Sequence, residues 1–278
     1  MNRRQIITGF AAAGLVPAAQ AQSKITKYCR FRKGNVTAFG IVEGETVRQL
    51  SGDLFANPKP TGATHKLADV KLLHPIAAPT KILALAGNYQ SHLGKAAPRS
   101  NPEPFYKPPS CLQNPEDPIV FPAGATNVHF ECELVVVMGK KAARVSKEQA
   151  SDCIFGVTCG NDVSERIWQN DPKVKDVQWW RAKGADTFGP LGPVIVRGID
   201  YGNLKIQTRL NGQVMQSDHT SHLVHDCASA VSFISQSVTL LPGDLLFTGT
   251  PGKTSPMKSG DVVEVEIEGI GILRNKIA

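Results

Sequence analysis

Short runs of apolar residues recur along the chain and are separated by glycine, proline and asparagine. Runs of this kind, rich in valine, isoleucine and leucine and bounded by turn-forming residues, are typical of β-strands. The pattern predicts strands at 82–86, 119–121, 133–138, 154–159, 194–196, 204–210, 245–248 and 262–267.

Turn and helix signals complete this picture. The dipeptide Asn211-Gly212 separates two strand-like runs and predicts a two-residue hairpin. Ser146 is followed three residues later by Gln149, the spacing of a capping box, which predicts the start of a short helix. A second helix is predicted over 221–235, where apolar residues recur at spacings of three and four. Because helices are few and do not alternate with strands, we expect a mainly β fold with short helices (α+β), a β-roll or sandwich, rather than a Rossmann or TIM architecture.

The first 21 residues have the layout of a secretory signal. Arg3 and Arg4 precede a weakly apolar stretch over 6–16, and Ala19-Gln20-Ala21 has the A-x-A form of a cleavage site. The paired arginines resemble a twin-arginine signal, which predicts export to the periplasm. The alternative is a retained membrane anchor, but the stretch is shorter than the roughly 20 residues needed to span a bilayer. We therefore expect residues 1–21 to be cleaved, leaving a chain without a membrane span.

The rest of the chain divides into a small and a large unit. Residues 22–77 carry short strand-like runs and then linking sequence rich in proline and glycine, which predicts a small β-rich N-terminal region. Residues 78–278 are predicted to form one larger β-rich domain, because strand-like runs continue to its end without a comparable break.

Composition narrows the kinds of partner and chemistry. The formal net charge of +7 is not gathered into basic blocks, so nucleic-acid binding is not expected and a small anionic substrate is favoured. Six cysteines show no CxxC spacing, and several fall in apolar runs, which favours free buried thiols. The sequence has no GxSxG or HExxH signature. His219, His222 and His225 recur at three-residue intervals, a spacing that does not bring all three together on a helix to bind zinc.

Three acidic residues are candidates for a metal site. Glu131 and Glu133 stand one residue apart at the mouth of the apolar run in HFECELVVVMG, and in a strand such residues share one face. Asp162 directly follows another strand-like run, IFGVTCG, in the segment CGNDVSER. An all-carboxylate set selects a hard cation such as Mg²⁺, Mn²⁺ or Ca²⁺. Spacing alone leaves open a solvated strand edge with a salt bridge to Arg166.

Other polar residues occupy settings suited to a binding site. His92 follows the run KILALAG and a turn, and Lys183 lies in the aromatic segment WWRAKGADTFGP. Thr250 lies on the glycine-rich turn of LLFTGTPG, whose backbone N–H groups could hold an anionic oxygen. Taken singly, a histidine or lysine in a loop is more often structural or solvated.

Together these segments resemble the fumarylacetoacetate hydrolase family over about residues 82–277. The resemblance implies a mixed β-sandwich roll that is usually a homodimer. It also implies a divalent metal held by carboxylates, and hydrolysis, decarboxylation or isomerisation of small keto or enol acids. It places Glu131, Glu133 and Asp162 on the family's metal ligands, with Mg²⁺ or Mn²⁺ as the expected ion and Ca²⁺ also compatible. The segments that carry it, in order, are GNYQSH, FYKP, HFECEL, GNDVSER, QWWRAKGADTFGPLGP, LNGQVMQ, PGDLLFTGTPG and KSGDVVEVEIEGIG.

The resemblance also assigns substrate contacts. Lys183 matches the lysine that contacts the substrate at the metal, and Thr250 matches the loop that receives a substrate carboxylate or carbonyl. Arg166 and Gln169 match the arginine and glutamine that follow the aspartate, and are expected to contact the substrate. With His92 moving the proton, the expected protein is a hydrolase of C–C bonds in small anionic keto acids such as acylpyruvates.

One position departs from the family pattern. Members that hydrolyse or decarboxylate commonly show HxxE after the NY turn, where the histidine and glutamate activate a water. Here the segment is HLGK, so Lys95 stands three residues after His92 in place of the glutamate. Three routes stay open: hydrolysis by His92 alone or with another acid such as Glu103, metal-assisted tautomerisation without an attacking water, and a non-catalytic periplasmic acid-binding protein.

Overall fold

The computed structural model describes residues 24–278, so the predicted signal at 1–21 lies outside the described residues. The mainly β fold with few short helices that the sequence predicted is confirmed. The strands are β1 (Thr26–Lys33), β2 (Val36–Glu43), β3 (Thr46–Ser51), β4 (Lys59–Lys66), β5 (Lys71–Leu73), β6 (Ile82–Leu85), β7 (Pro104–Lys107), β8 (Leu112–Gln113), β9 (Val128–His129), β10 (Cys132–Met138), β11 (Ile154–Asn161), β12 (Ser164–Glu165), β13 (Gly189–Arg197), β14 (Lys205–Leu210), β15 (Gln213–His219), β16 (Leu245–Phe247), β17 (Val262–Ile267) and β18 (Gly271–Lys276). The helices are α1 (Gln90–Leu93), α2 (Lys147–Cys153), α3 (Arg166–Asn170), α4 (Trp180–Gly184) and α5 (Cys227–Ser235), with short 3₁₀ turns η1 (Leu67–Asp69), η2 (Pro109–Cys111) and η3 (Thr220–His222).

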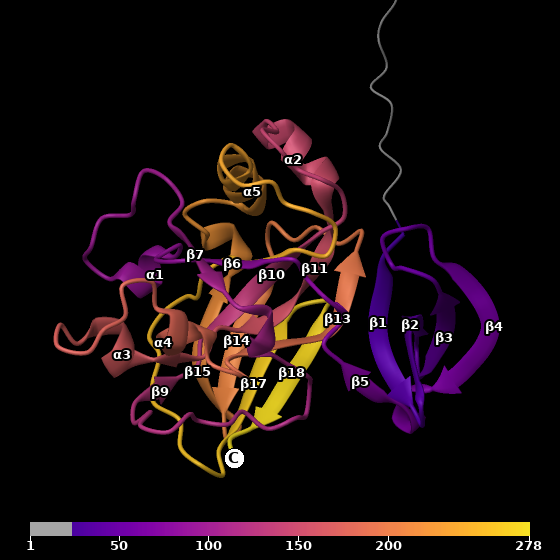
Figure 1. Cartoon of the computed structure of the whole chain (residues 1–278), viewed down its shortest axis with the longest axis horizontal. Coiled ribbons are helices and arrows are strands. Elements are labelled where there is room, and N and C mark those ends of the chain that lie inside the picture. The colour runs from indigo at the N-terminus through magenta and orange to yellow at the C-terminus, as the bar shows by residue number, and fades with distance from the viewer. Residues whose placement is uncertain (1–23) are drawn as a thin grey trace, which may run out of the picture.

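Two sheets build the molecule. Twelve strands form one sheet, in the order β4-β3-β2-β1-β13-β11-β10-β16-β6-β7, with β5 beside β1 and β8 beside β13. A second sheet has the order β15-β14-β17-β18, and a short two-stranded pair joins β12 to β9. Helices α2 and α5 lie side by side at one end, while α1, α3 and α4 lie on the side away from the N-terminal strands (Figure 1).

Strand β10 passes through the core and is buried along its whole length. Its even-numbered residues, such as Leu134 and Val136, belong to the large apolar cluster that includes residues of the second sheet. Its odd-numbered residues Val135 and Val137 belong to a different cluster on the other face. Burial on both faces explains why the sequence of this strand is continuously apolar instead of alternating.

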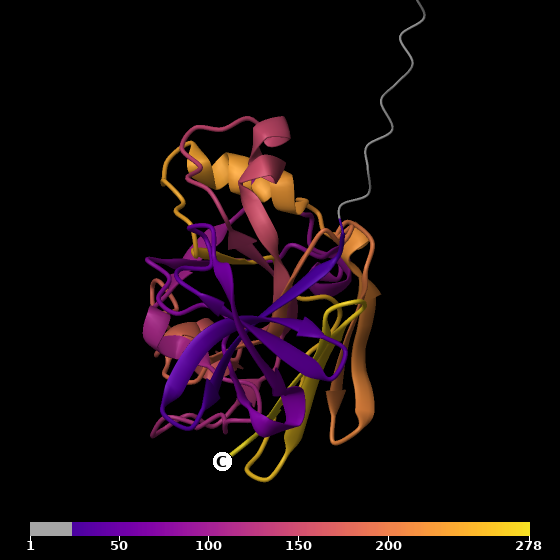
Figure 2. The same cartoon turned by 90° about the vertical axis from the view of Figure 1, so that its right-hand side faces the viewer.

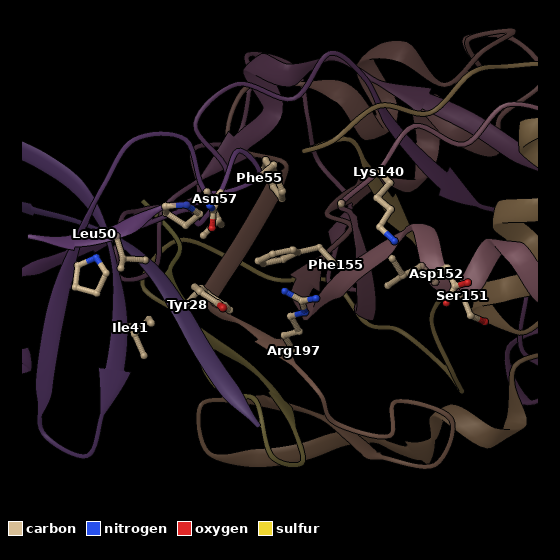
Figure 3. Close-up of a pocket in the computed structure, with 15 residues that line it drawn as sticks. Tyr28, Ile41, Leu50, Phe55, Asn57, Lys140, Ser151, Asp152, Phe155 and Arg197 are labelled. Carbon is tan, nitrogen blue, oxygen red and sulfur yellow. The ribbon is translucent and has the colours of Figure 1, made fainter. Parts of the chain in front are cut away.

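The N-terminal strands β1–β4 form a lobe beside the larger body (Figures 1 and 2). The lobe nevertheless continues the main sheet, because β1 pairs with β13 and aligns Tyr28 with Ile195. Aromatic rings fill the seam: the centroid of Phe155 lies 5.1 Å from that of Tyr28 and 5.2 Å from that of Phe55. The guanidinium of Arg197 lies 5.3 Å from the centroid of Phe155 (Figure 3). These contacts hold the N-terminal lobe against strands β11 and β13.

The turn and capping signals are found where the sequence predicted them. Asn211 and Gly212 join β14 to β15 with φ of 52° and 80°, the left-handed conformation that a two-residue hairpin turn requires. The side chain of Ser146 accepts a hydrogen bond from the Gln149 N–H, and the Gln149 side chain accepts one from the Ser146 N–H, so the capping box of α2 is present. Both signals are local, which is why the sequence alone reveals them.

The predicted start of the second helix, at Ser221, was wrong. Helix α5 begins at Cys227, after Asp226 caps it by accepting a hydrogen bond from the N–H of Ser229. The preceding residues leave the helical path because Val224 and His225 donate their backbone N–H groups to the backbone and side-chain oxygens of Asn88. This long-range contact outweighs the local helical pattern.

Two expectations about chemistry and membranes can be compared directly with the structure. All six cysteines are free and buried, as predicted. Across residues 24–278, no helix has the length and apolar character to cross a bilayer.

Candidate metal centre

The three predicted carboxylates meet at the entrance of β10. Cys132 of β10 pairs with Asn161 of β11, and the Asp162 N–H donates to the Glu131 carbonyl at 2.9 Å, so Glu131 and Asp162 lie opposite each other. Glu133 lies on the same face of the strand as Glu131. Oxygen atoms of all three carboxylates lie within 4.8 Å of one another, and all three residues are buried. The structure therefore brings together the residues that the strand pattern suggested.

Two glycines leave room for this cluster. Gly160 lies opposite Glu133 in the β10–β11 pair, and a Cβ there would come within 2.4 Å of a Val135 methyl group and 2.5 Å of the Phe247 ring. Only glycine fits such a position. Gly249 donates its backbone N–H to Glu133 Oε2 at 2.7 Å, which fixes the orientation of that carboxylate. Close backbone approach thus positions Glu133 from two sides.

Cationic side chains from other segments surround the carboxylates. Lys183 Nζ, from α4, donates to Glu131 Oε2 and Asp162 Oδ2, both at 2.8 Å, and to Ser164 Oγ at 2.7 Å. Arg166 Nη2, at the start of α3, lies 2.5 Å from Glu131 Oε1. The salt bridge to Arg166 that the sequence left open therefore exists, but the carboxylates it joins are buried and do not form a solvated edge.

Lys107 is a further member of the cluster that sequence reasoning did not identify. Its Nζ, at the end of β7, lies 2.6 Å from Asp162 Oδ1 and also donates to the carbonyls of Lys183 and Phe188. Burial alone would lower the pKa of Lys107, but the adjacent Asp162 raises it above its usual value. The segment FYKP contributed to the family resemblance, yet nothing in it shows that this lysine points inward.

The three carboxylates differ in whether they have an ion-pair partner. Among residues 24–278, Glu131 and Asp162 form ion pairs with lysine or arginine, whereas Glu133 forms none. Burial, followed by repulsion from Asp162 and Glu131, raises the pKa of Glu133 well above its usual value. Burial also opposes ionisation of Glu131, but Arg166 and Lys183 hold its pKa below the usual range. An all-oxygen donor set in which one carboxylate has no ion-pair partner among the described residues fits a hard divalent ion such as Mg²⁺ or Mn²⁺.

The cluster opens into a cavity of about 370 Å³ that contains most of the predicted site. A cavity of this size suits a small organic acid. Asp162 lies beneath it, held by Lys107 and Lys183. The predicted site residues that line the cavity are His92, Glu131, Glu133, Arg166, Gln169, Lys183 and Thr250, and they are joined by Arg99, Phe105 and Trp179.

Polar contacts orient the remaining lining residues. Arg166 Nη1 donates to Gln169 Oε1 at 2.6 Å, so these two predicted contacts form a pair at the mouth of the cavity. Thr250 Oγ1 accepts a hydrogen bond from Gln216 Nε2 at 3.0 Å, and the same amide donates to the Pro251 carbonyl. Gln216 is buried and was not identified from the sequence, because its role depends on the loop that it holds.

His92 has a backbone partner in place of the expected carboxylate. Its Nδ1 lies 2.7 Å from the carbonyl oxygen of Gly252, which can only accept, so Nδ1 carries the proton. Lys95 is exposed and does not line the cavity. Glu103, the alternative acid, forms an ion pair of 2.9 Å with Arg99. The carbonyl partner could not have been predicted, since a backbone oxygen leaves no mark in the sequence.

Comparisons with known proteins point in the same direction. Residues 81–278 match the family model described as fumarylacetoacetate (FAA) hydrolase, C-terminal, and residues 26–75 match the model Rv2993c-like, N-terminal. Protein Rv2993c of Mycobacterium tuberculosis is 42% identical over 252 residues, which cover 86% of this chain and 93% of that protein. The mitochondrial oxaloacetate tautomerase Fahd2a of Rattus norvegicus is 36% identical over 222 residues, covering 76% of this chain and 70% of its own.

Solved structures share the fold over most of the chain. The 2-hydroxyhepta-2,4-diene-1,7-dioate isomerase from Mycobacterium marinum superimposes with a TM-score of 0.83 and 42% identity, covering 91% of this chain and 98% of its own. A maleylpyruvate hydrolase from Sphingobium sp. SYK-6, in complex with manganese(II) ion and pyruvate, has a TM-score of 0.75 and 28% identity, again with 91% and 98% coverage. Proteins with this fold therefore include isomerases and hydrolases.

Proposed function

This chain belongs to the fumarylacetoacetate hydrolase family, and on that premise we propose that it is a divalent-metal-dependent keto–enol tautomerase of small 2-keto acids. The observation that carries the proposal is the contact between His92 Nδ1 and the Gly252 carbonyl. It supplies a base of fixed tautomer at the cavity without the carboxylate partner that water activation commonly uses. The tautomerase and isomerase among the similar proteins support the same class of reaction.

The metal would be held by Glu131, Glu133 and Asp162. Their oxygen atoms form a compact set, and Glu133 has no ion-pair partner within the part of the chain that the structure describes. Mg²⁺ or Mn²⁺ suits this set best, and Ca²⁺ is compatible with it. When bound, such an ion acts as a Lewis acid that stabilises negative charge on the keto oxygen of the substrate.

Lys183 and Thr250 would hold the acid itself. Lys183 Nζ lines the cavity while it bonds to two of the carboxylates, so its positive charge lies beside the place where a substrate oxygen must approach. Thr250 Oγ1 already accepts from Gln216, which leaves its own O–H to donate to a substrate carboxylate or carbonyl. Arg166 adds a second positive charge at the mouth, which favours an anionic substrate.

His92 would transfer the proton. Because Nδ1 donates to the Gly252 carbonyl, Nε2 carries the lone pair and is the basic atom. Nε2 removes a proton from the carbon next to the keto group, and the electrons of the broken C–H bond form the enolate. Returning that proton to the oxygen completes the enol, and the reverse sequence restores the keto acid. A backbone carbonyl fixes the tautomer but has no charge to compensate the imidazolium, so His92 lacks the carboxylate partner that water activation commonly uses.

Hydrolysis of a C–C bond, the activity expected from the sequence, is the second candidate. Among the described residues, His92 forms one side-chain hydrogen bond, through Nδ1, so Nε2 has no protein partner and could also accept from a water. The similarity to a maleylpyruvate hydrolase supports this candidate. We further propose, from residues 1–21 and the family resemblance, that the protein acts in the periplasm as a homodimer.

Turnover assays separate these functions. Oxaloacetate and acetylpyruvate are supplied to the purified protein with Mg²⁺, and the enol absorbance and the release of pyruvate are followed separately. We expect the wild-type protein to accelerate enol decay. In His92→Ala this acceleration should fall roughly 100-fold, as for loss of a general base, whereas His65→Gln in strand β4 should leave it unchanged. Release of pyruvate and acetate from acetylpyruvate as the main products would favour hydrolysis, whereas pyruvate and CO2 from oxaloacetate would indicate decarboxylation. Stabilisation by the acids with no turnover would identify a binding protein and overturn the tautomerase proposal.

A further inference from the structure

Both backbone groups of Gly252 are held by consecutive residues of helix α1. The carbonyl accepts from His92 Nδ1 at 2.7 Å, and the N–H donates to Ser91 Oγ at 3.1 Å. Gly252 has a φ of 59°, and a Cβ built on it would meet no atom within 4 Å. No atom packs where a Gly252 side chain would be, and the two hydrogen bonds hold its backbone.

Ser91 is in turn fixed by a carboxylate on another element. Its hydroxyl donates to Asp218 Oδ2, on strand β15, at 2.8 Å. Asp218 also accepts from the His219 N–H at 2.8 Å and from His222 Nδ1 at 2.5 Å. Burial would raise the pKa of Asp218, but these hydrogen bonds lower it, so the carboxylate stays ionised and is a strong acceptor.

Strand β15 thus holds the 250–252 loop at two points. Gln216 donates to Thr250 and Pro251 from inside the molecule. Two residues further along, on the same face of the strand, Asp218 reaches Gly252 through Ser91. The strand is part of the second sheet, so the loop that contacts His92 is fixed to rigid structure.

We propose that Ser91 and Asp218 are positioning residues for the reaction, because they hold the Gly252 carbonyl where it orients the His92 ring. This inference rests on the proposed role of His92 in proton transfer. In a chain with Lys95 in place of the family's glutamate, the tautomer of His92 depends on a backbone oxygen, and that oxygen must be held still. Neither Ser91 nor Asp218 lines the cavity, and they reach His92 through Gly252.

Removal of the Ser91 hydroxyl tests the inference kinetically. In Ser91→Ala we expect kcat to fall roughly tenfold to a hundredfold, as small misplacement of a reacting group does, with KM changed less than about twofold because the cavity lining is intact. Ser91→Thr keeps the hydroxyl and should restore most of the loss. Ser259→Ala, which alters an exposed serine elsewhere, is the matched control. The double variant with Asp218→Ala should lose little more than either alone, because both act through one contact.

A second measurement does not depend on turnover. Nitrogen NMR of the histidine rings in the purified protein with Mg²⁺ reports which ring nitrogen of His92 carries the proton. Wild type should show the proton on Nδ1, and Ser91→Ala should show a mixture of tautomers. If the wild type turns over none of the acids, the proposed function fails, but this spectrum still decides the positioning role. Unchanged kcat and an unchanged His92 tautomer in Ser91→Ala, or an equal loss of kcat in Ser91→Thr, would overturn it.

Discussion

At the scale of single residues, Lys107 shows how much of the site is buried charge. Its side chain is fully buried against Asp162, so removing the ammonium breaks a buried ion pair and leaves the carboxylate with Lys183 alone. We expect Lys107→Met to lower the free energy of unfolding by about 3–5 kcal/mol. Lys33→Met breaks the exposed pair with Asp69 and should cost less than about 1 kcal/mol. Denaturant titration measures both, and equal effects would show that the Lys107 pair is not buried in solution.

Lys95 makes the opposite prediction. It stands where the family's glutamate would be, but it is exposed and does not line the cavity. Lys95→Glu and Lys95→Ala should therefore leave kcat/KM within about twofold of wild type, as changes at exposed positions usually do. Steady-state assays of tautomerisation and pyruvate release check this. A rise in hydrolysis in Lys95→Glu alone would mean that the new carboxylate reaches His92 and that the loop differs from this structure.

The acidic residues of the site were easier to identify from the sequence than some of the groups that contact them or fix the site. Glu131, Glu133 and Asp162 could be selected from the sequence because strand periodicity and the end of an apolar run are local patterns. Lys107 and the Gly252 carbonyl could not, because their roles arise from contacts with segments far away in the chain. Of the cations around the carboxylates, Lys183 and Arg166 could be selected through the family resemblance, whereas Lys107 could not.

At the scale of elements, the residue that follows strand β5, His74, should make folding depend on pH. Burial, followed by the charge of Arg30, lowers the pKa of His74 from 6.5 to about 4. The unfolded chain takes up this proton near pH 6.5, whereas the folded chain does not until about pH 4. The contribution of neutral His74 to the free energy of unfolding is thus fully present above pH 6.5 and is lost as the pH falls towards 4.

Replacing this side chain isolates the effect. The free energy of unfolding of wild type should fall between pH 7 and pH 4.5, with His74 responsible for on the order of 2 kcal/mol of the fall. His74→Gln should make the fall smaller by this amount. Urea titrations at both pH values measure it, with His219→Gln as a control at an exposed position. The same pH slope in His74→Gln as in wild type would show that another group controls acid stability.

The elements themselves were predicted where their signals are local. The buried strand β10, the capped start of α2 and the Asn211-Gly212 hairpin follow from periodicity and turn chemistry. The start of α5 was missed because Asn88 captures the backbone of residues 224–225 from a distant part of the chain. A pattern within one segment cannot include such competition.

At the scale of the whole molecule, the site forms where one pair of strands places three carboxylates beside cationic side chains from several other elements. Strands β10 and β11 place the carboxylates, while β7, α3 and α4 bring the cations to them. The fold class could be predicted, because it follows from the sum of many local patterns and from the family resemblance. The joining of the N-terminal lobe to the main sheet through β1 and β13 could not, since pairing between distant strands has no signature in either strand.

The central claim, that the three carboxylates hold a divalent ion, is tested most directly by metal titration of the stripped protein. The purified protein is treated with chelator, and its melting temperature is followed as Mg²⁺ or Mn²⁺ is added. An ion that binds only the folded state should stabilise it by about 2.7 kcal/mol at a hundredfold excess over Kd. Wild type and Glu45→Gln, an exposed control, should show the rise, and Glu133→Gln should not. A melting temperature that neither metal moves in wild type, or an equal rise in Glu133→Gln, would contradict the account.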